Sequence, residues 1–228
     1  MLAQALHRVT QRLADAARSA GRPAPRLLAV SKTQPAAAIA ELATAGQHAF
    51  GENYVQEALA KQTELKQAEP HALPLEWHLI GHLQSNKARE AATAFDWVQT
   101  VDRAKLVAAL ARHRPAESPP LNVLIQVNID DETSKHGCTP QEVPSLAAAI
   151  AAEPRLRLRG LMAIPAPAPE AAVRRAAFAR MRHLFEALAI EHPQVDTLSM
   201  GMSDDIELAV DEGATLVRVG TALFGKRN

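Results

Sequence analysis

The apolar residues of the chain recur at two different spacings. In the first segment, Leu2, Leu6, Val9 and Leu13 fall on one face of a helix. Residues 26–31 then form a short apolar run that has the length of a strand. Because this change of spacing repeats along the chain, the pattern predicts helices and strands in alternation.

Eight segments of the sequence fit short buried strands, with helical patterns between them. They are residues 26–31, 49–51, 77–80, 97–100, 123–127, 158–162, 197–200 and 216–219. Strands that alternate with helices form a parallel sheet, and eight is the number that closes into a barrel. An open doubly wound sheet is the alternative, but its first strand would lead into a glycine-rich phosphate turn, and residues 31–34 are not one. We therefore predict a single (β/α)8 TIM barrel, with residues 1–228 as one domain.

Charge and cysteine content narrow the classes of partner. The 25 Lys and Arg residues balance the 25 Asp and Glu residues, which argues against a nucleic acid or an acidic membrane surface as partner. The single cysteine, Cys138, cannot form an internal disulfide, which fits a reducing cytosol. The sequence contains neither a signal-peptide pattern nor an apolar stretch long enough to span a bilayer. We expect a cytoplasmic protein.

Lys32 directly follows the first predicted strand. In a barrel of this type, chemistry gathers where the strands end at their carboxyl termini. A partly desolvated lysine has a lowered pKa, and its neutral amine can attack an aldehyde. The alternative is a lysine whose stem covers apolar surface and whose charge reaches water.

The segments after the last two predicted strands are rich in small residues and hydroxyls. Residues 199–203 include Ser199, Met200 and Gly201, and Gly220 and Thr221 follow the eighth strand. The loops after strands seven and eight build the standard phosphate site of such barrels, although ordinary strand-to-helix turns also favour glycine and serine. A reactive lysine opposite a phosphate cradle indicates a phosphorylated aldehyde as the ligand.

Other chemistry-bearing residues receive less weight. His78 and His82 have the spacing of zinc ligands on a helix, but here they fall on a strand and a turn with no acidic or cysteine partner nearby in sequence, so we expect no metal site. Cys138 would need a positioned base to act in catalysis. The acidic run at residues 130–132 could bind a cation, but we interpret it as a solvated loop.

Three further lysines carry the same amine group as Lys32. We interpret Lys87, Lys135 and Lys226 as surface charges. Any of them that lies at the barrel mouth could contact phosphate or bind the phosphorylated aldehyde transiently, as a second site for that ligand. The sequence does not decide between these roles.

Five ordered motifs resemble one known family. Residues 29–33, 50–57, 78–87, 198–205 and 217–225 are similar to the pyridoxal phosphate homeostasis proteins, the YggS-like family. The resemblance spans almost the whole chain. Residues 128–137 depart from the family pattern, where we expect Ser-Gly-Glu-like residues in place of the acidic run, and this leaves the role of Lys135 open.

The resemblance implies a barrel of the alanine racemase N-terminal type, the fold type III of enzymes that use pyridoxal 5′-phosphate (PLP). It implies that PLP forms a Schiff base with Lys32. It also implies which residues contact the cofactor: Asn53 in the pocket wall, Ser199, Met200 and Gly201 with Gly220 and Thr221 at the phosphate, and Arg218 at the pyridine nitrogen. The implied role is intracellular vitamin B6 homeostasis without established catalysis, with PLP-dependent apoenzymes as possible partners.

The same residues bear on whether the protein is an enzyme. An arginine at the pyridine nitrogen disfavours protonation of that nitrogen and weakens the ring as an electron sink. A racemase also needs a second acid or base, which in barrel racemases is a tyrosine contributed with the help of an added β domain. The predicted barrel ends near Val219, the chain ends at Asn228, and the sole tyrosine, Tyr54, follows the second strand. We therefore expect a monomeric binding protein with no catalytic residues; a weak amino-acid racemase and a barrel for another phosphorylated metabolite are the alternatives.

Overall fold

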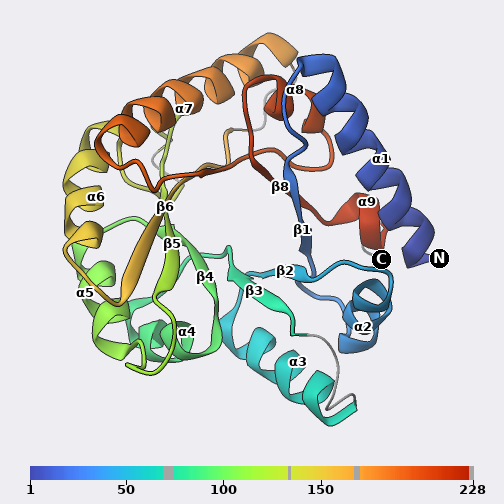
Figure 1. The fold of residues 1–228 in the computed structure, drawn as a ribbon, viewed down its shortest axis with the longest axis horizontal. Coiled ribbons are helices and arrows are strands. Elements are labelled where there is room, and N and C mark those ends of the chain that lie inside the picture. The colour runs from blue at the N-terminus through green and yellow to red at the C-terminus, as the bar shows by residue number, and fades with distance from the viewer. Residues whose placement is uncertain (69–73, 133–134, 167–169, 226–228) are drawn as a thin grey trace.

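The strands of the protein close into a parallel barrel. The computed structural model describes residues 1–68, 74–132, 135–166 and 170–225, so Lys226 lies outside the described residues. Eight strands follow one another around the barrel in the order of the sequence, and β1 pairs with both β2 and β8 to close it (Figure 1). The predicted (β/α)8 barrel is confirmed.

All eight predicted strand segments form strands, and the predicted bounds differ from the observed ones by two residues or fewer. The observed strands are β1 (Arg26–Val30), β2 (Ala49–Glu52), β3 (Glu76–Leu79), β4 (Trp97–Val101), β5 (Leu121–Gln126), β6 (Leu156–Met162), β7 (Thr197–Ser199) and β8 (Leu216–Val219). Their inner and outer faces are both covered, which explains why they read as continuous apolar runs.

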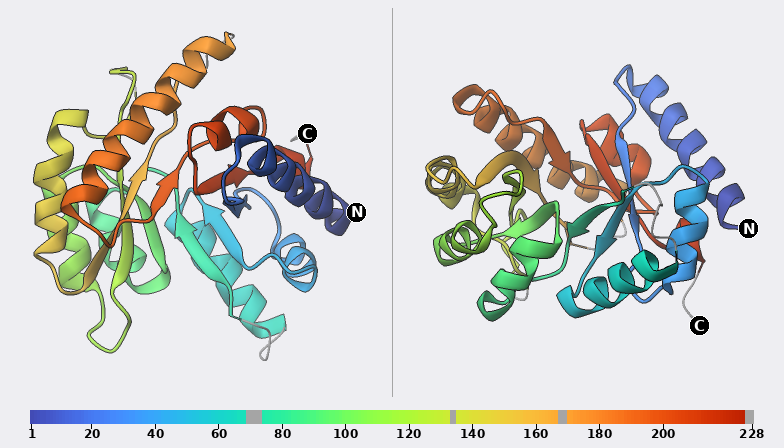
Figure 2. Two further views of the ribbon diagram at one scale, coloured as in Figure 1. Left: turned by 45° about the horizontal axis from the view of Figure 1, so that its top comes forward. Right: turned by 60° about the horizontal axis from the view of Figure 1, so that its bottom comes forward.

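Helices form the outer layer of the barrel, as Figure 2 shows from two sides. They are α1 (Leu2–Ala20), α2 (Ala36–Thr44), α3 (Val55–Ala68), α4 (Ala88–Ala94), α5 (Ala104–His113), α6 (Val143–Ala151), α7 (Ala171–Glu191), α8 (Ile206–Asp211) and α9 (Thr221–Phe224), with 3-10 turns η1 (Ser85–Lys87) and η2 (Pro140–Glu142) before α4 and α6. The first helix, α1, precedes the barrel and packs against α8 and α9. No helix in the described ranges is both long and apolar enough to cross a membrane.

Side chains alternate between the inside of the barrel and the helix layer. On β1, Leu28 and Val30 pack inside the barrel with Leu216 of β8 and Ile80, which follows β3. Ala29, between them, belongs to the larger core that joins the barrel to its helices. Lys32 follows two residues beyond Val30, in the turn at the carboxyl end of β1.

Candidate functional site

Lys32 and Gly220 both follow the carboxyl ends of strands, β1 and β8, that pair with each other. Gly220 directly follows β8, and a Cβ atom at this position would lie only 3.4 Å from the carbonyl oxygen of Val30. The loop after β8 therefore runs against the end of β1, which leads into Lys32. The Lys32 side chain is half-buried. The fold thus brings together the predicted aldehyde anchor and one half of the predicted phosphate site.

A buried ion-pair network fixes the backbone on both sides of Lys32. The ammonium of Lys61, on α3, donates hydrogen bonds to the Ser31 carbonyl at 2.8 Å, to Glu52 Oε1 at 2.8 Å and to Glu57 Oε1 at 2.6 Å. The Ser31 hydroxyl donates to Glu52 at 2.6 Å. Beyond Lys32, the Thr33 N–H donates to Glu57 at 2.5 Å. The network therefore holds the residue before Lys32 and the residue after it.

The same network contains a carboxylate whose burial is energetically unfavourable. Glu52 is fully buried, and burial raises the pKa of its carboxyl although Lys61 and Ser31 stabilise the anion. Its second oxygen, Oε2, has no hydrogen-bond partner among the described residues. The backbone of Thr33 adopts a φ of 65°, a left-handed conformation that is unusual for a β-branched residue. Buried charge and backbone strain thus concentrate around Lys32, as they often do at functional sites.

Arg218 is a fixed cation inside the barrel. It lies on β8 with only 3% of its surface exposed. Its guanidinium donates to Ser199 Oγ at 2.7 Å and to the carbonyl oxygen of Ala163 at 2.8 Å. Burial lowers the pKa of Arg218 to about 10, so the group is still protonated at neutral pH.

A hydrogen-bonded chain continues from Arg218 through the barrel. Ser199 Oγ lies 2.7 Å from Gln99 Oε1, Gln99 Nε2 lies 2.8 Å from His78 Nδ1, and His78 Nε2 lies 2.7 Å from Glu76 Oε1. His78 is fully buried, which lowers its pKa and keeps the ring neutral. A neutral ring has one N–H, which donates to the Glu76 carboxylate, so Nδ1 accepts from the Gln99 amide. Each group from Arg218 to His78 therefore donates to the next one, and the Glu76 carboxylate accepts at the end of the series.

These hydrogen bonds determine which further contacts the Ser199 hydroxyl can make. Its hydroxyl hydrogen goes to Gln99, and the hydroxyl oxygen accepts from Arg218. In this arrangement the hydroxyl has no hydrogen to donate to a phosphate. Any contact of Ser199 with a phosphate would come from its backbone, and the side chain serves instead to orient Arg218.

The loop after β7 depends on a glycine. Gly201 has a φ of 90°, and a Cβ atom there would lie 2.4 Å from the Cβ of Ala209 on α8. The next residue, Met202, donates its N–H to Asp205 Oδ1 at 2.6 Å. The Ser203 hydroxyl accepts the N–H of Ala222 at 3.4 Å, which joins this loop to α9. The two loops of the predicted phosphate site are thus in contact.

The remaining predicted phosphate residues differ in exposure. Met200 is fully buried in the core between barrel and helices, and its N–H donates to Leu216 at 3.2 Å, so its side chain does not face the mouth. Thr221 is exposed at the start of α9. Contact of these residues with a phosphate stays a prediction.

Asn53 and Tyr54 occupy the loop after β2. Asn53 is half-buried, and its backbone lies so close to Gly81 that a Cβ atom there would be 2.1 Å from the Asn53 carbonyl oxygen. This close approach joins the loops after β2 and β3. Tyr54 is 66% exposed, so it is a solvent-facing side chain at this edge of the barrel.

The two histidines with the sequence spacing of zinc ligands lie apart from one another. His78 is inside the barrel, whereas His82 is near Asp102 and His136 at the mouth, so the two histidines do not form a pair. Burial raises the pKa of Cys138 to about 12, which leaves the thiol protonated and unreactive.

The lysines and the acidic run form surface ion pairs. Lys87 pairs with Glu90 at 3.4 Å, and Lys135 pairs with Glu132 at 3.2 Å. In the acidic run, Asp130 pairs with Arg180 on α7 at 2.7 Å. These contacts agree with surface charges, and a second cofactor site stays untested.

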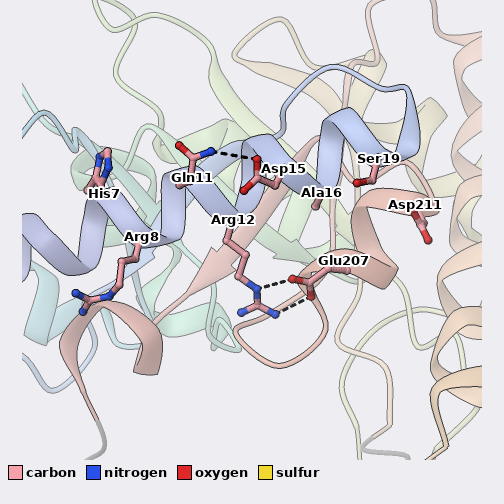
Figure 3. A pocket seen from close by; sticks show the side chains of 9 residues that line it. All are labelled: His7, Arg8, Gln11, Arg12, Asp15, Ala16, Ser19, Glu207 and Asp211. Atoms are coloured by element: carbon pink, nitrogen blue, oxygen red, sulfur yellow. Dashed lines mark hydrogen bonds and ion pairs between the residues drawn. The ribbon is translucent and has the colours of Figure 1, made fainter.

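A groove of about 640 Å³ lies elsewhere, between α1 and α8 (Figure 3). It is lined by His7, Arg8, Gln11, Arg12, Asp15, Ala16, Ser19, Glu207 and Asp211. Arg12 donates to Glu207 through two nitrogens at 2.6 and 2.7 Å, and it also donates to the carbonyl oxygen of Ser203 at 2.7 Å. The groove contains none of the predicted site residues, but Arg12 supports the loop after β7 from the outside.

The sequence matches known proteins over its whole length. The family profile of the alanine racemase N-terminal domain matches residues 5–228. A protein of Pseudomonas aeruginosa named pyridoxal phosphate homeostasis protein is 55% identical over 100% of this chain and 96% of its own length. The Escherichia coli protein of the same name is 53% identical over 100% of this chain and 97% of its own.

Solved structures agree with this assignment. PipY of Synechococcus elongatus, solved with PLP bound, is 40% identical, covers 99% of this chain and 100% of its own, and superposes with a TM-score of 0.83; without PLP the TM-score is 0.87. Alanine racemase of Corynebacterium glutamicum, at 21% identity and a TM-score of 0.64, covers 96% of this chain and 62% of its own, and it shows the fold alone. The chain therefore belongs to the family of pyridoxal phosphate homeostasis proteins.

Proposed function

We propose that this protein binds PLP at the barrel mouth and serves vitamin B6 homeostasis, with Lys32 as the covalent anchor. One observation supports this most: Lys32, Gly201 and Gly220 all follow the carboxyl ends of strands, and the Arg218 guanidinium donates to the carbonyl oxygen of Ala163, which directly follows β6. The relatives bear the name of this role, and PipY, at 40% identity, was solved with PLP bound.

The residues present fit the chemical groups of PLP. The amine of Lys32 would attack the aldehyde carbon, form an imine and release one water molecule. Gly201 and Gly220 have no side chain, so the backbone can approach a phosphate closely. The Arg218 guanidinium has five N–H groups, and hydrogen bonds to Ser199 and Ala163 use two of them. An aldehyde anchor, a phosphate cradle and a cation for the ring nitrogen are thus all available.

The same residues favour a carrier over an enzyme. A protonated arginine beside the pyridine nitrogen disfavours a second positive charge there, and the ring then stabilises carbanions less well. The sole tyrosine, Tyr54, is 66% exposed on the loop after β2, a poor position for an acid or base facing Lys32. We infer that the protein holds and releases PLP without turning over amino acids.

The experiment that tests this proposal is a spectrum of the purified protein with PLP, before and after borohydride, followed by peptide mapping. We expect an imine band, and a reduced label on Lys32. Lys32→Ala should abolish the band and retain some phosphate-dependent affinity, whereas Lys105→Ala, an exposed lysine on α5, should behave as the parent. An equal imine yield in Lys32→Ala would refute the anchor, and steady racemisation of amino acids by the PLP-loaded protein would favour the racemase.

We propose further that the protein acts as a monomer in the cytoplasm and passes PLP to apoenzymes. A closed barrel leaves no free sheet edge to pair with a second copy, which supports a monomer. The single free cysteine supports a reducing compartment. Light scattering would report the mass, and a PLP-free apoenzyme mixed with loaded protein would regain activity faster than free PLP allows if transfer is direct.

A further inference from the structure

Three potential metal ligands converge at the part of the mouth opposite the predicted phosphate site. His82 lies in the loop after β3, Asp102 directly follows β4, and His136 lies in the loop after β5. The rings of His82 and His136 are stacked with centroids 3.7 Å apart, and His82 Nδ1 lies 3.9 Å from Asp102 Oδ2. One ligand atom from each of the three residues lies within 4.8 Å of the other two. We propose that this cluster binds a divalent transition metal of the zinc class.

The donor set fits such a metal. Two imidazole nitrogens and one carboxylate oxygen form the ligand set of open zinc sites and of other imidazole-preferring divalent metals. Metal–ligand bonds of about 2.0–2.2 Å would require the ligand atoms to lie roughly 3.3–3.5 Å apart in a tetrahedral site. The present separations are all within 4.8 Å, and metal binding would require the side chains to rotate and the two stacked rings to part. A water molecule would complete the coordination, because the His82 side chain is 31% exposed.

Neighbouring contacts hold two of the loops in place. Arg103 contacts Asp102 Oδ1 and donates to the carbonyl oxygen of Leu83 at 3.0 Å. The Thr100 hydroxyl donates to the carbonyl oxygen of Gly81 at 2.9 Å. The ends of β3 and β4 are therefore tied together, and the carboxylate is oriented with Oδ2 toward His82. Arg103 acts here as the partner that orients a ligand, although its charge weakens attraction of a cation.

Hydrogen bonds to the last residue of β5 hold the loop that carries His136. Gln126, the last residue of β5, donates from its side chain to the carbonyl oxygen of His136 at 3.2 Å. The Cys138 N–H donates to the carbonyl oxygen of Gln126 at 2.9 Å. His136 therefore sits on a loop that is bonded back to the barrel next to β4.

The cluster lies apart from the proposed cofactor site. The cluster uses the ends of β3, β4 and β5, whereas Lys32 and the predicted phosphate loops follow β1, β7 and β8. The proposal is therefore independent of PLP binding.

The test uses the full chain, freed of metal by a chelator, and titrated with Zn²⁺ in a calorimeter. Co²⁺ in parallel gives a visible absorption spectrum that reports nitrogen and oxygen coordination. The variants are His82→Ala, His136→Ala and Asp102→Asn, and the matched control is His7→Ala, which changes an exposed histidine on α1. Circular dichroism checks that each variant is folded. We expect the histidine variants to fold because His82 and His136 are both exposed.

We expect one equivalent of Zn²⁺ to bind to the parent and to His7→Ala. Either histidine variant should bind at least tenfold more weakly and lose the Co²⁺ spectrum, and Asp102→Asn should bind more weakly than the parent. Absence of binding to the parent at millimolar Zn²⁺ would overturn the proposal. So would affinity that is unchanged in His82→Ala or His136→Ala. The imine band of the same variants with PLP checks the other site separately.

Discussion

The hydroxyl of Ser199 lies 2.7 Å from the side-chain oxygen of Gln99 in the interior of the barrel. This contact assigns the only hydrogen of the hydroxyl to Gln99 and turns its oxygen toward Arg218, 2.7 Å away. Gln99 is oriented in turn, because its amide donates to His78. A residue on β4 thus determines how a guanidinium on β8 is held at the proposed cofactor site.

Gln99→Leu tests this relationship. The substitution removes the acceptor of the buried Ser199 hydroxyl hydrogen and the donor to the buried Nδ1 of His78. We expect the free energy of unfolding to fall by about 2–3 kcal/mol. Because Ser199 would no longer orient the Arg218 guanidinium, we expect PLP to bind roughly tenfold less tightly. This loss is equivalent to about one hydrogen bond. Urea denaturation and PLP titration measure both quantities.

The control for this prediction is Gln194→Ala, which changes an exposed glutamine before β7. It should change neither quantity measurably. If Gln99→Leu lowered stability but left PLP affinity at the parental value, Gln99 would be a packing residue without influence on Arg218.

Two glycines with similar φ angles allow the cost of backbone strain to be measured separately from the cost of a steric clash. Gly201 has a φ of 90° and Gly46 a φ of 99°, but only at Gly201 would a Cβ atom meet a neighbour, Ala209, at 2.4 Å. We expect Gly46→Ala to cost about 1 kcal/mol of unfolding free energy from backbone strain alone. Gly201→Ala should cost at least about 2 kcal/mol more and should weaken PLP binding, since the loop after β7 must move away from α8. Equal losses in the two variants, measured by thermal denaturation, would mean that this loop yields freely.

The sequence was sufficient to predict the barrel, and the predicted site residues stay a prediction. Strand positions follow from apolar runs, and the alternation along each strand then determines which side chains point inward. Lys32 and Arg218 both have the inward phase of their strands, and so does His78. A polar residue at an inward position of an apolar strand is a signal that could also have identified Gln99, which we did not single out.

Contacts between loops could not be predicted in this way. His82 and His136 are far apart in sequence, and they meet only because the barrel places β3, β4 and β5 side by side. Lys61 has the sequence context of any lysine on a helical surface, yet its ammonium is buried beside Glu52. Such pairings depend on the stagger of the strands and the tilt of the helices, which periodicity does not specify.

Lys61→Met tests whether the buried network supports the Lys32 segment. Removing the ammonium leaves Glu52 buried without its counterion, and we expect a loss of about 3–5 kcal/mol of unfolding free energy at pH 8. The pKa of Glu52 is already raised by burial, so the carboxyl can take up a proton in the variant and the loss should be smaller at pH 5. The control is Lys66→Met, an exposed lysine on the same helix, which should cost less than about 0.5 kcal/mol. A loss in Lys61→Met as small as in the control would show that the buried ion pairs do not stabilise the fold.

The pH dependence of stability should report the neutral state of His78. Burial lowers its pKa in the folded protein below the ordinary value of 6.5, so below that pH the unfolded chain binds a proton that the folded protein does not. Stability is therefore present above pH 6.5 and falls by up to about 1.4 kcal/mol for each unit below it, until the folded pKa is reached. His78→Gln removes this titration, so the stability advantage of the parent over the variant should shrink between pH 7.5 and pH 5.5 by about 1 kcal/mol. Urea denaturation at a series of pH values measures the difference, and an advantage that stayed constant or grew on acidification would mean that the ring is already protonated inside the barrel.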